Sequence, residues 1–271
     1  SPKIYPGQWL SAQVRIPEER AAVQACMYVF DHNGKQVYTG ETILLNPGVW
    51  TKLVFRIPPM EGALLSEAGV QFTVPGNSAG QQDFAAYIDD LEYGGSPDYT
   101  IDFAKERELM LPMGHCEITQ FTRLKGYSFL EKNALHLTAD DCGEIYTGSH
   151  LFRNYTVTAV LEPVCGGGHY INVRVQGGLR SYAAGFDERG RLGLWKKECD
   201  YRELISIPYE WKYGERYTLT VAVMDNRISV RDEDGRELIC YVDKERPYLA
   251  GAVGFSVRKS GHLAVHRLRI G

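Results

Sequence analysis

The sequence predicts an all-β protein made of two consecutive antiparallel β-sandwiches. Three observations support this: hydrophobic residues recur at every second position, turn residues interrupt the runs about every ten positions, and helical periodicity is nearly absent. The chain has 271 residues, of which 44% are hydrophobic and 24% charged. That length and composition are typical of about two globular domains with buried cores.

The alternating pattern is clearest in six segments: residues 10–16, 53–57, 70–74, 155–161, 171–175 and 217–223. Turn-forming residues rich in Asn, Asp, Pro and Gly occur at 31–34, 46–48, 187–190 and 232–235. Short, regularly spaced strands separated by such turns indicate sandwiches or barrels. We expect each run to be a strand with one face in a core.

The best domain boundary is Gly94-Gly95-Ser96-Pro97, because a glycine pair followed by proline ends a strand. We therefore expect one domain over residues 1–97 and a second over residues 98–271. The second domain opens and closes with strand-like segments at 99–103 and 266–270. Since the first and last strands of a sandwich often pair, we expect these two segments to be neighbours.

Charge argues against several functions. Thirty Lys and Arg face 34 Asp and Glu, giving a net charge of -4, which is too balanced for a protein that must neutralise many phosphates. No apolar run reaches the ~18 residues that a spanning helix needs. No P-loop, Rossmann, G-x-S-x-G or zinc-binding motif is present. We expect neither nucleic acid nor a membrane as a partner.

The six cysteines include no C-x-x-C pair, and a chain of this size does not need disulfides to fold. Cys26 and Cys240 lie in strand-like runs, where a thiol behaves as a small hydrophobic group. We expect reduced thiols, which favours a cytoplasmic protein, although secretion stays open.

The first domain carries P-G-V-W-T at 47–51 and Y-I-D-D at 87–90. It resembles the galactose-binding-like jelly roll that is common among carbohydrate-binding modules. The resemblance covers most of residues 8–93 and implies a jelly-roll sandwich. The opening strands of such modules are missing, so we expect a minimal or truncated version.

The second domain, through residues 144–148 and 172–186, resembles the concanavalin-like lectin and glucanase sandwich. More narrowly, it resembles the accessory β-domain that follows the helical catalytic domain in some bacterial ADP-ribosylglycohydrolase-family proteins. This resemblance spans nearly the whole domain. It implies an accessory role next to a catalytic domain of the same polypeptide.

Polar side chains alternate along residues 170–176 and again after a short Gly-Gly-Leu connection. If both segments are adjacent strands, their planar amide, guanidinium and phenol groups share one face and suit sugar hydroxyls. An ordinary solvent-facing surface is the competing interpretation. The predicted ligand-binding residues are Tyr170, Asn172, Arg174, Gln176, Arg180 and Tyr182.

Two acidic clusters suggest other chemistry. Glu198 and Glu203 match the E-x-D-x-x-E pattern of glycosidases built on the concanavalin-like sandwich, in which two carboxylates flank the scissile bond. A solvated hairpin tip explains the cluster without any chemistry, and we favour the hairpin. In the first domain, Asp89 is a weak candidate for a calcium ligand, because adjacent carboxylates on a strand point to opposite faces.

The sequence thus predicts a non-catalytic carbohydrate-binding or glycan-binding region of a larger hydrolase, with no catalytic residues of its own. No cofactor is expected except calcium in the first domain. A glycoside hydrolase that uses Glu198 and Glu203 is one alternative. A structural module that holds a catalytic domain or partner chain is another.

Overall fold

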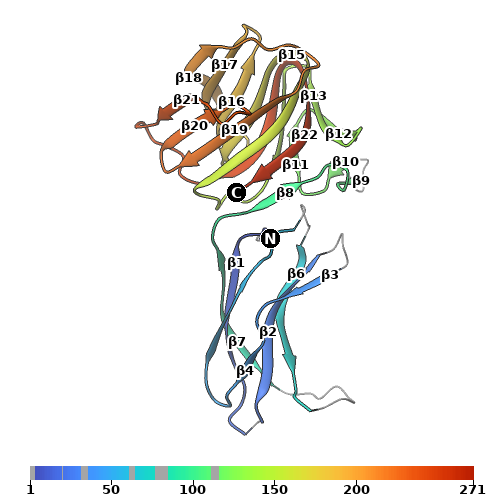
Figure 1. Cartoon of the computed structure of the whole chain (residues 1–271), viewed down its shortest axis with the longest axis vertical. Helices are drawn as coiled ribbons and strands as arrows, with labels where there is room; N and C mark the ends of the chain where they lie inside the picture. Colours follow the sequence, from blue (N-terminus) through green and yellow to red (C-terminus); the bar gives the residue numbers. More distant parts are fainter. Residues whose placement is uncertain (1–3, 20, 32–35, 61–64, 77–84, 111–115) are drawn as a thin grey trace. The chain divides into compact units, whose positions relative to one another are not determined.

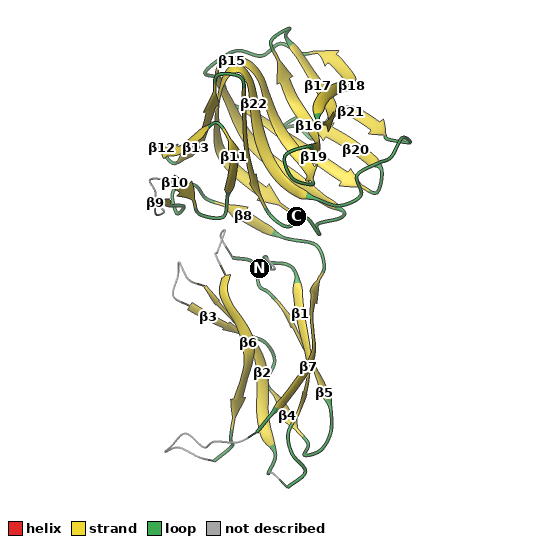
Figure 2. Ribbon diagram, turned by 180° about the vertical axis from the view of Figure 1, so that it is seen from behind, coloured by secondary structure: helices red, strands yellow, loops and turns green. Residues whose placement is uncertain are grey.

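The computed structural model describes residues 4–19, 21–31, 36–60, 65–76, 85–110 and 116–271, and every regular element within them is a β-strand (Figures 1 and 2). The prediction of an all-β antiparallel chain is confirmed. No helix in this part of the chain could cross a membrane. The chain forms two compact units, residues 4–98 and residues 99–271.

The first unit is a small sandwich of two antiparallel sheets. One sheet has the order β5-β1-β7. In the other, β3 and β4 pair with the two ends of one edge of β2, and β6 pairs with the opposite edge. Its strands are β1 (Trp9–Arg15), β2 (Val23–Asp31), β3 (Gln36–Thr39), β4 (Ile43–Leu45), β5 (Thr51–Arg56), β6 (Leu65–Thr73) and β7 (Tyr87–Gly94). Leu10, Ala12 and Val14 of β1 alternate into the core, where they meet Val29 and Leu53. The period-two pattern of the sequence is therefore the inward face of each strand.

The second unit contains the remaining strands. They are β8 (Tyr99–Ile101), β9 (Glu108–Met110), β10 (Cys116–Ile118), β11 (Thr122–Lys125), β12 (Tyr127–Glu131), β13 (Ala134–Ala139), β14 (Cys142–Thr147), β15 (Tyr155–Val175), β16 (Arg180–Asp187), β17 (Arg191–Glu198), β18 (Asp200–Pro208), β19 (Tyr217–Met224), β20 (Arg227–Arg231), β21 (Glu237–Val242) and β22 (Ala252–Ile270). All but β9 and β10 belong to one continuous hydrogen-bonded array.

Two long strands, β15 and β22, pass through both layers of the second unit. Both bend midway, where their pairing shifts register and where Gly166, Gly168, Lys259 and Ser260 have positive φ angles. Left-handed backbone at bulges makes a strand turn sharply. The bend separates two sheets. Sheet 1 has the strand order β11-β14-β22-β15-β16-β17-β18. Sheet 2 contains the other halves of β15 and β22 together with β12, β13, β19, β20 and β21.

One face of sheet 1, here called the inner face, packs against sheet 2. The ring of Phe186 in β16 lies 5.0 Å from that of Tyr217 in β19. Ile171 and Val173 of β15 share this face and are fully buried. The opposite face of sheet 1 is here called the outer face, and alternation places the residues between them, such as Tyr170 and Asn172, on it.

Two pairings expected from the sequence are confirmed. Strand β8 pairs with the end of β22, with Tyr99 opposite Ile270 and Ile101 opposite Leu268. Strands β15 and β16 are antiparallel neighbours joined by the short connection after Gln176. The first and last strands of the second unit therefore lie together in sheet 2.

Candidate functional site

The six residues predicted to share one exposed face do not do so, and that geometric prediction is wrong. The register of β15 and β16 sets Asn172 opposite Ala183 and Val173 opposite Tyr182. Residues directly opposite in an antiparallel pair share a face, so Tyr182 lies with Val173 on the inner face. Its hydroxyl donates to Asp243 Oδ2 at 2.5 Å.

Arg174 leaves the expected face for a different reason. Its φ is 54°, and the pairing of β15 with β22 shifts between Asn172 and Val175, so strict alternation ends there. The side chain is fully buried, and its guanidinium donates to the backbone oxygens of Leu249, Val223 and Asp225. These acceptors make Arg174 part of the internal structure.

Gln176 and Arg180 lie at the turn between β15 and β16, and both are exposed. Their backbones are joined by a hydrogen bond from Gln176 N to Arg180 O at 2.8 Å, and Gln176 Nε2 donates to the Ala250 carbonyl at 2.9 Å. Of the predicted set, Tyr170 and Asn172 are the two residues on the outer face. Whether any of the six binds a ligand stays a prediction.

The outer face carries a buried polar network around Glu144. Glu144 in β14 is fully buried and forms an ion pair with Lys197 of β17, and Tyr146 donates to it at 2.5 Å. Tyr201 of β18 reaches it at 3.5 Å through its hydroxyl. Burying a carboxylate requires a counter-charge and further donors, and this network supplies both.

Asn172 connects this network to the centre of the sheet. The Ser256 hydroxyl donates to Asn172 Oδ1 at 2.7 Å, while Asn172 Nδ2 donates to Ser181 Oγ and to Tyr201 OH, each at 3.3 Å. These contacts join β22, β15, β16 and β18. They fix the orientation of the Tyr201 ring.

Beside this network, three aromatic rings gather on the outer face. The rings of Tyr170 and Trp195 lie 4.8 Å apart, and that of Tyr201 stacks 6.0 Å from Tyr170. Gly193 makes room for the indole, since a Cβ there would lie 2.5 Å from Trp195. The rings form a cluster of their own with Ala183, outside the core between the sheets.

The cluster lies in the lining of a hollow of about 230 Å³, which we call the aromatic hollow. Trp195 and Tyr170 line it but are only 8% and 6% exposed, so each ring contributes a small part of its surface. Charged side chains make up most of the remaining lining. The lining residues are Tyr170, Asp187, Glu188, Arg189, Arg191, Trp195, Tyr201, Glu203, Arg258 and Lys259.

Arg191 organises one side of this hollow. It bridges two carboxylates, contacting Asp187 at 2.6 Å and Glu203 at 3.0 Å. Hydrogen bonds from the Ser206 hydroxyl and from Arg191 lower the pKa of Glu203. On the other side, the Lys259 ammonium donates to Glu188 and lowers the pKa of that carboxyl group. Both carboxylates therefore stay ionised at neutral pH.

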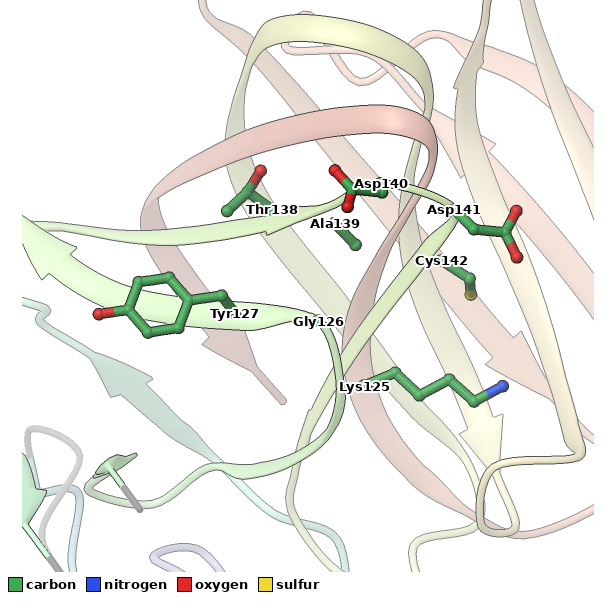
Figure 3. Close-up of a pocket in the computed structure, with 8 residues that line it drawn as sticks. All are labelled: Lys125, Gly126, Tyr127, Thr138, Ala139, Asp140, Asp141 and Cys142. Atoms are coloured by element: carbon green, nitrogen blue, oxygen red, sulfur yellow. The ribbon is translucent and has the colours of Figure 1, made fainter. Parts of the chain in front are cut away.

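A second, wider hollow of about 460 Å³ lies where β11, β12, β13 and β14 meet (Figure 3). It is lined by Lys125, Gly126, Tyr127, Thr138, Ala139, Asp140, Asp141 and Cys142. Figure 3 shows Tyr127 at one end of the hollow and Lys125 at the other. Burial and Glu144 raise the pKa of the Cys142 thiol, so it is a poor nucleophile.

The two acids of the glycosidase alternative lie on opposite faces of the β17–β18 hairpin. Glu198 ends β17 and is followed by Cys199 in a left-handed turn, while Glu203 lies within β18 opposite Trp195 on the outer face. Both are exposed, as the hairpin interpretation predicted. Alternation sets Lys197 on the outer face and Glu198 on the other, so the two acids do not flank one point.

The calcium candidate Asp89 is exposed in β7, and its Oδ1 accepts a hydrogen bond from the Asp90 amide at 2.8 Å. Within the described ranges, no group of three or more His, Cys, Asp or Glu side chains is arranged to hold a metal ion. Calcium at Asp89 stays a prediction. Cys26, Cys142, Cys165, Cys199 and Cys240 are free thiols.

The aromatic hollow includes four residues that are not among those predicted from the sequence: Trp195, Tyr201, Arg191 and Arg258. For Trp195 and Tyr201 the available signal is the alternation of Trp195 with Lys197 and of Tyr201 with Glu203 on either side of the turn at Cys199. The hairpin interpretation of Glu198 and Glu203 accounts for the turn, but both strands extend well into sheet 1. The alternation indicates that these residues share one face of their strands, but only the pairing of β17 with β16 shows that it is the outer face of sheet 1.

No family model matches the sequence, and no curated protein matches it. Solved structures with a similar arrangement include a carbohydrate binding module, CBM66, from Bacillus subtilis. It is 15% identical, and the match covers 54% of this chain and 92% of that one with a TM-score of 0.49.

A galectin and the VIP36 domain are also among the matching structures. The galectin LEC-6 of Caenorhabditis elegans is 14% identical over 47% of this chain and 89% of that one, with a TM-score of 0.37. The exoplasmic/lumenal domain of VIP36, in a form bound to Ca2+ and Man3GlcNAc, is 15% identical over 56% of this chain and 84% of that one, with a TM-score of 0.43. At these values the function must be argued from the residues of the site.

Proposed function

We propose that the second unit is a glycan-binding module and that the sugar binds in the aromatic hollow. The observation that carries the proposal is that aromatic rings and charged groups line the same hollow. Three packed rings, Tyr170, Trp195 and Tyr201, line the same hollow as ionised groups of both signs. The proposal concerns recognition and assigns no catalytic step to this chain.

A sugar ring matches such a lining because it has an apolar C–H face and an edge of hydroxyl groups. Aromatic rings offer an apolar surface to the first. Hydroxyls both donate and accept, so they can bind carboxylate oxygens such as those of Glu203 and guanidinium donors such as those of Arg191. A hollow of about 230 Å³ is smaller than the roughly 300–1,000 Å³ of pockets for drug-sized molecules, which suits one sugar unit.

A glycan array with the whole chain tests the proposal, followed by calorimetric titration of the best ligand. Glu203→Gln should weaken binding about tenfold, since hydrogen bonds to charged groups are worth about 1.5–3 kcal/mol. Glu237→Gln is the matched control, because Glu237 has a similar exposure of 37% and an ion pair with Arg227, but lies in β21. Equal losses in both variants, or no bound glycan, would contradict the proposal.

We propose further that this binding role is accessory to a larger, ADP-ribosylglycohydrolase-like hydrolase in the cytoplasm. The sequence resemblance of residues 144–148 and 172–186 and the five free thiols support it. Hydrolysis assays with β-glucans and ADP-ribosylated substrates test it on the chain alone, which we expect to be inactive. Hydrolysis that disappears in Glu203→Gln would instead favour the glycoside hydrolase alternative.

A further inference from the structure

The charged residues that line the aromatic hollow do not balance among themselves. Its lining holds four cations and three carboxylates, which leaves one positive charge in excess. The carboxylates already have partners: Arg191 bridges Asp187 and Glu203, and Lys259 pairs with Glu188. Two arginines of the lining, Arg189 and Arg258, lie outside these pairs.

Of these arginines, Arg258 is the one whose guanidinium is positioned to bind an anion. Its side chain is 32% exposed, and its ion-pair partner is Asp200 at 3.5 Å, whose side chain is 88% exposed at the β17–β18 turn. An exposed pair at that distance contributes little, and water or a ligand can replace it. The guanidinium of Arg258 can therefore bind a second anion at small cost.

The position of that guanidinium is set by the outer-face network. Its central carbon lies 4.9 Å from the centre of the Tyr201 ring, and Lys197 Nζ lies 5.1 Å from the same ring. The Tyr201 hydroxyl is held by Ser256 at 3.2 Å and by Asn172 at 3.3 Å. A stacked, pre-positioned guanidinium loses less freedom when it binds a ligand.

We infer that the aromatic hollow selects an acidic sugar, with the sugar carboxylate on Arg258; this inference rests on the proposed glycan-binding function. A guanidinium fork matches a planar carboxylate with two parallel hydrogen bonds. One excess positive charge matches a single negative charge. A phosphate group carries about -1.5 to -2, and the carboxylates of Asp187, Glu188 and Glu203 would repel the extra charge.

The test compares a uronic-acid-terminated oligosaccharide with the same oligosaccharide reduced to the neutral sugar, by calorimetric titration of the whole chain. We expect the acid to bind at least about tenfold more tightly. In Arg258→Gln the two ligands should bind alike, and Arg258→Lys should restore part of the preference. Arg227→Gln, an exposed ion-paired arginine of β20, is the matched control and should keep the full preference.

The outcomes separate the inference from the proposed function. Equal binding of acid and neutral sugar by the wild type would overturn the inference and leave glycan binding standing. A sulfated or phosphorylated sugar that binds more tightly than the uronic acid would also overturn it. Failure to bind any glycan would overturn both. The ligand comparison uses the wild type, so it stands even if Arg258→Gln fails to fold.

Discussion

Lys196 and Lys197 are neighbours in β17, yet they belong to opposite faces of sheet 1, and both are buried in ion pairs. On the inner face, Lys196 contacts Asp243 at 2.8 Å and also donates to the backbone oxygens of Glu245 and Arg246. On the outer face, Lys197 pairs with Glu144. The difference lies in what each network contacts next.

The inner network ends on backbone oxygens, and the guanidinium of Arg174 likewise donates to backbone oxygens and to Asn154 Oδ1. The outer network continues through Tyr201 to Arg258, whose side chain reaches the aromatic hollow. Burial of a charged group therefore does not by itself separate an internal structural role from a role in the proposed glycan site. The two networks differ in their last charged group: in the inner network it is bonded to backbone oxygens, whereas in the outer network it lines the aromatic hollow.

The largest expected effect comes from removing either lysine. Lys196→Met and Lys197→Met each leave a buried carboxylate without its partner, which costs about 3–5 kcal/mol. Urea unfolding should show both losses. Adding Asp243→Asn or Glu144→Gln to the respective lysine variant should recover much of each. Only the Lys197 variants should change glycan affinity, and equal effects of both pairs on affinity would break the comparison.

A smaller effect should separate the two arginines. Arg174→Met leaves several buried backbone oxygens without a donor and should cost about 3 kcal/mol, since each unsatisfied group costs about 1–3. Arg258→Met changes a partly exposed side chain and should stay within about 0.5 kcal/mol. Thermal melts of both variants test this. A strongly destabilised Arg258→Met would show that the outer network is closed as well.

The smallest effect concerns pH. Burial lowers the pKa of His136, His169 and His262 below their ordinary value of 6.5. Between those lowered values and 6.5 the unfolded chain binds more protons than the folded chain, so stability falls as pH drops through this window. Urea midpoints at pH 7.5 and 5.5 measure the loss, and His136→Gln should reduce it.

The same pH step sharpens the contrast between stability and binding. The carboxylates of the aromatic hollow with shifted pKa values, Glu188 and Glu203, are shifted downward, so they stay ionised at pH 5.5. Glycan affinity should therefore be unchanged while stability falls. Affinity that falls in parallel with stability would mean that a histidine takes part in binding.

Much of the fold was predictable because apolar and polar residues alternate along its strands. The runs around Leu10 and Ile171 became strands with the expected residues inward, and the segments at 99–101 and 268–270 pair as expected. The burial of the Arg174 side chain was not predictable. A single residue in left-handed conformation reverses the alternation, and nothing local in Val173-Arg174-Val175 announces it.

The candidate site was predictable only in part. The sequence correctly put Tyr170 and Asn172 on one face of β15, but the register between β15 and β16 decided that Ala183, and not Tyr182, shares that face. A shift of one residue exchanges the two faces of a strand, so no argument from one strand can choose between them.

By itself, the sequence determined that this chain is all-β, where most strands run and which of their residues are apolar enough to be buried. Only the tertiary structure decided which polar residues are buried inside and which line the aromatic hollow. Tyr170, Trp195, Tyr201 and Arg258 come from four strands up to 88 positions apart, and their meeting depends on strand order and register. Those are set by long-range pairing and by the bends of β15 and β22, because hydrogen bonds between strands are not encoded in any local period.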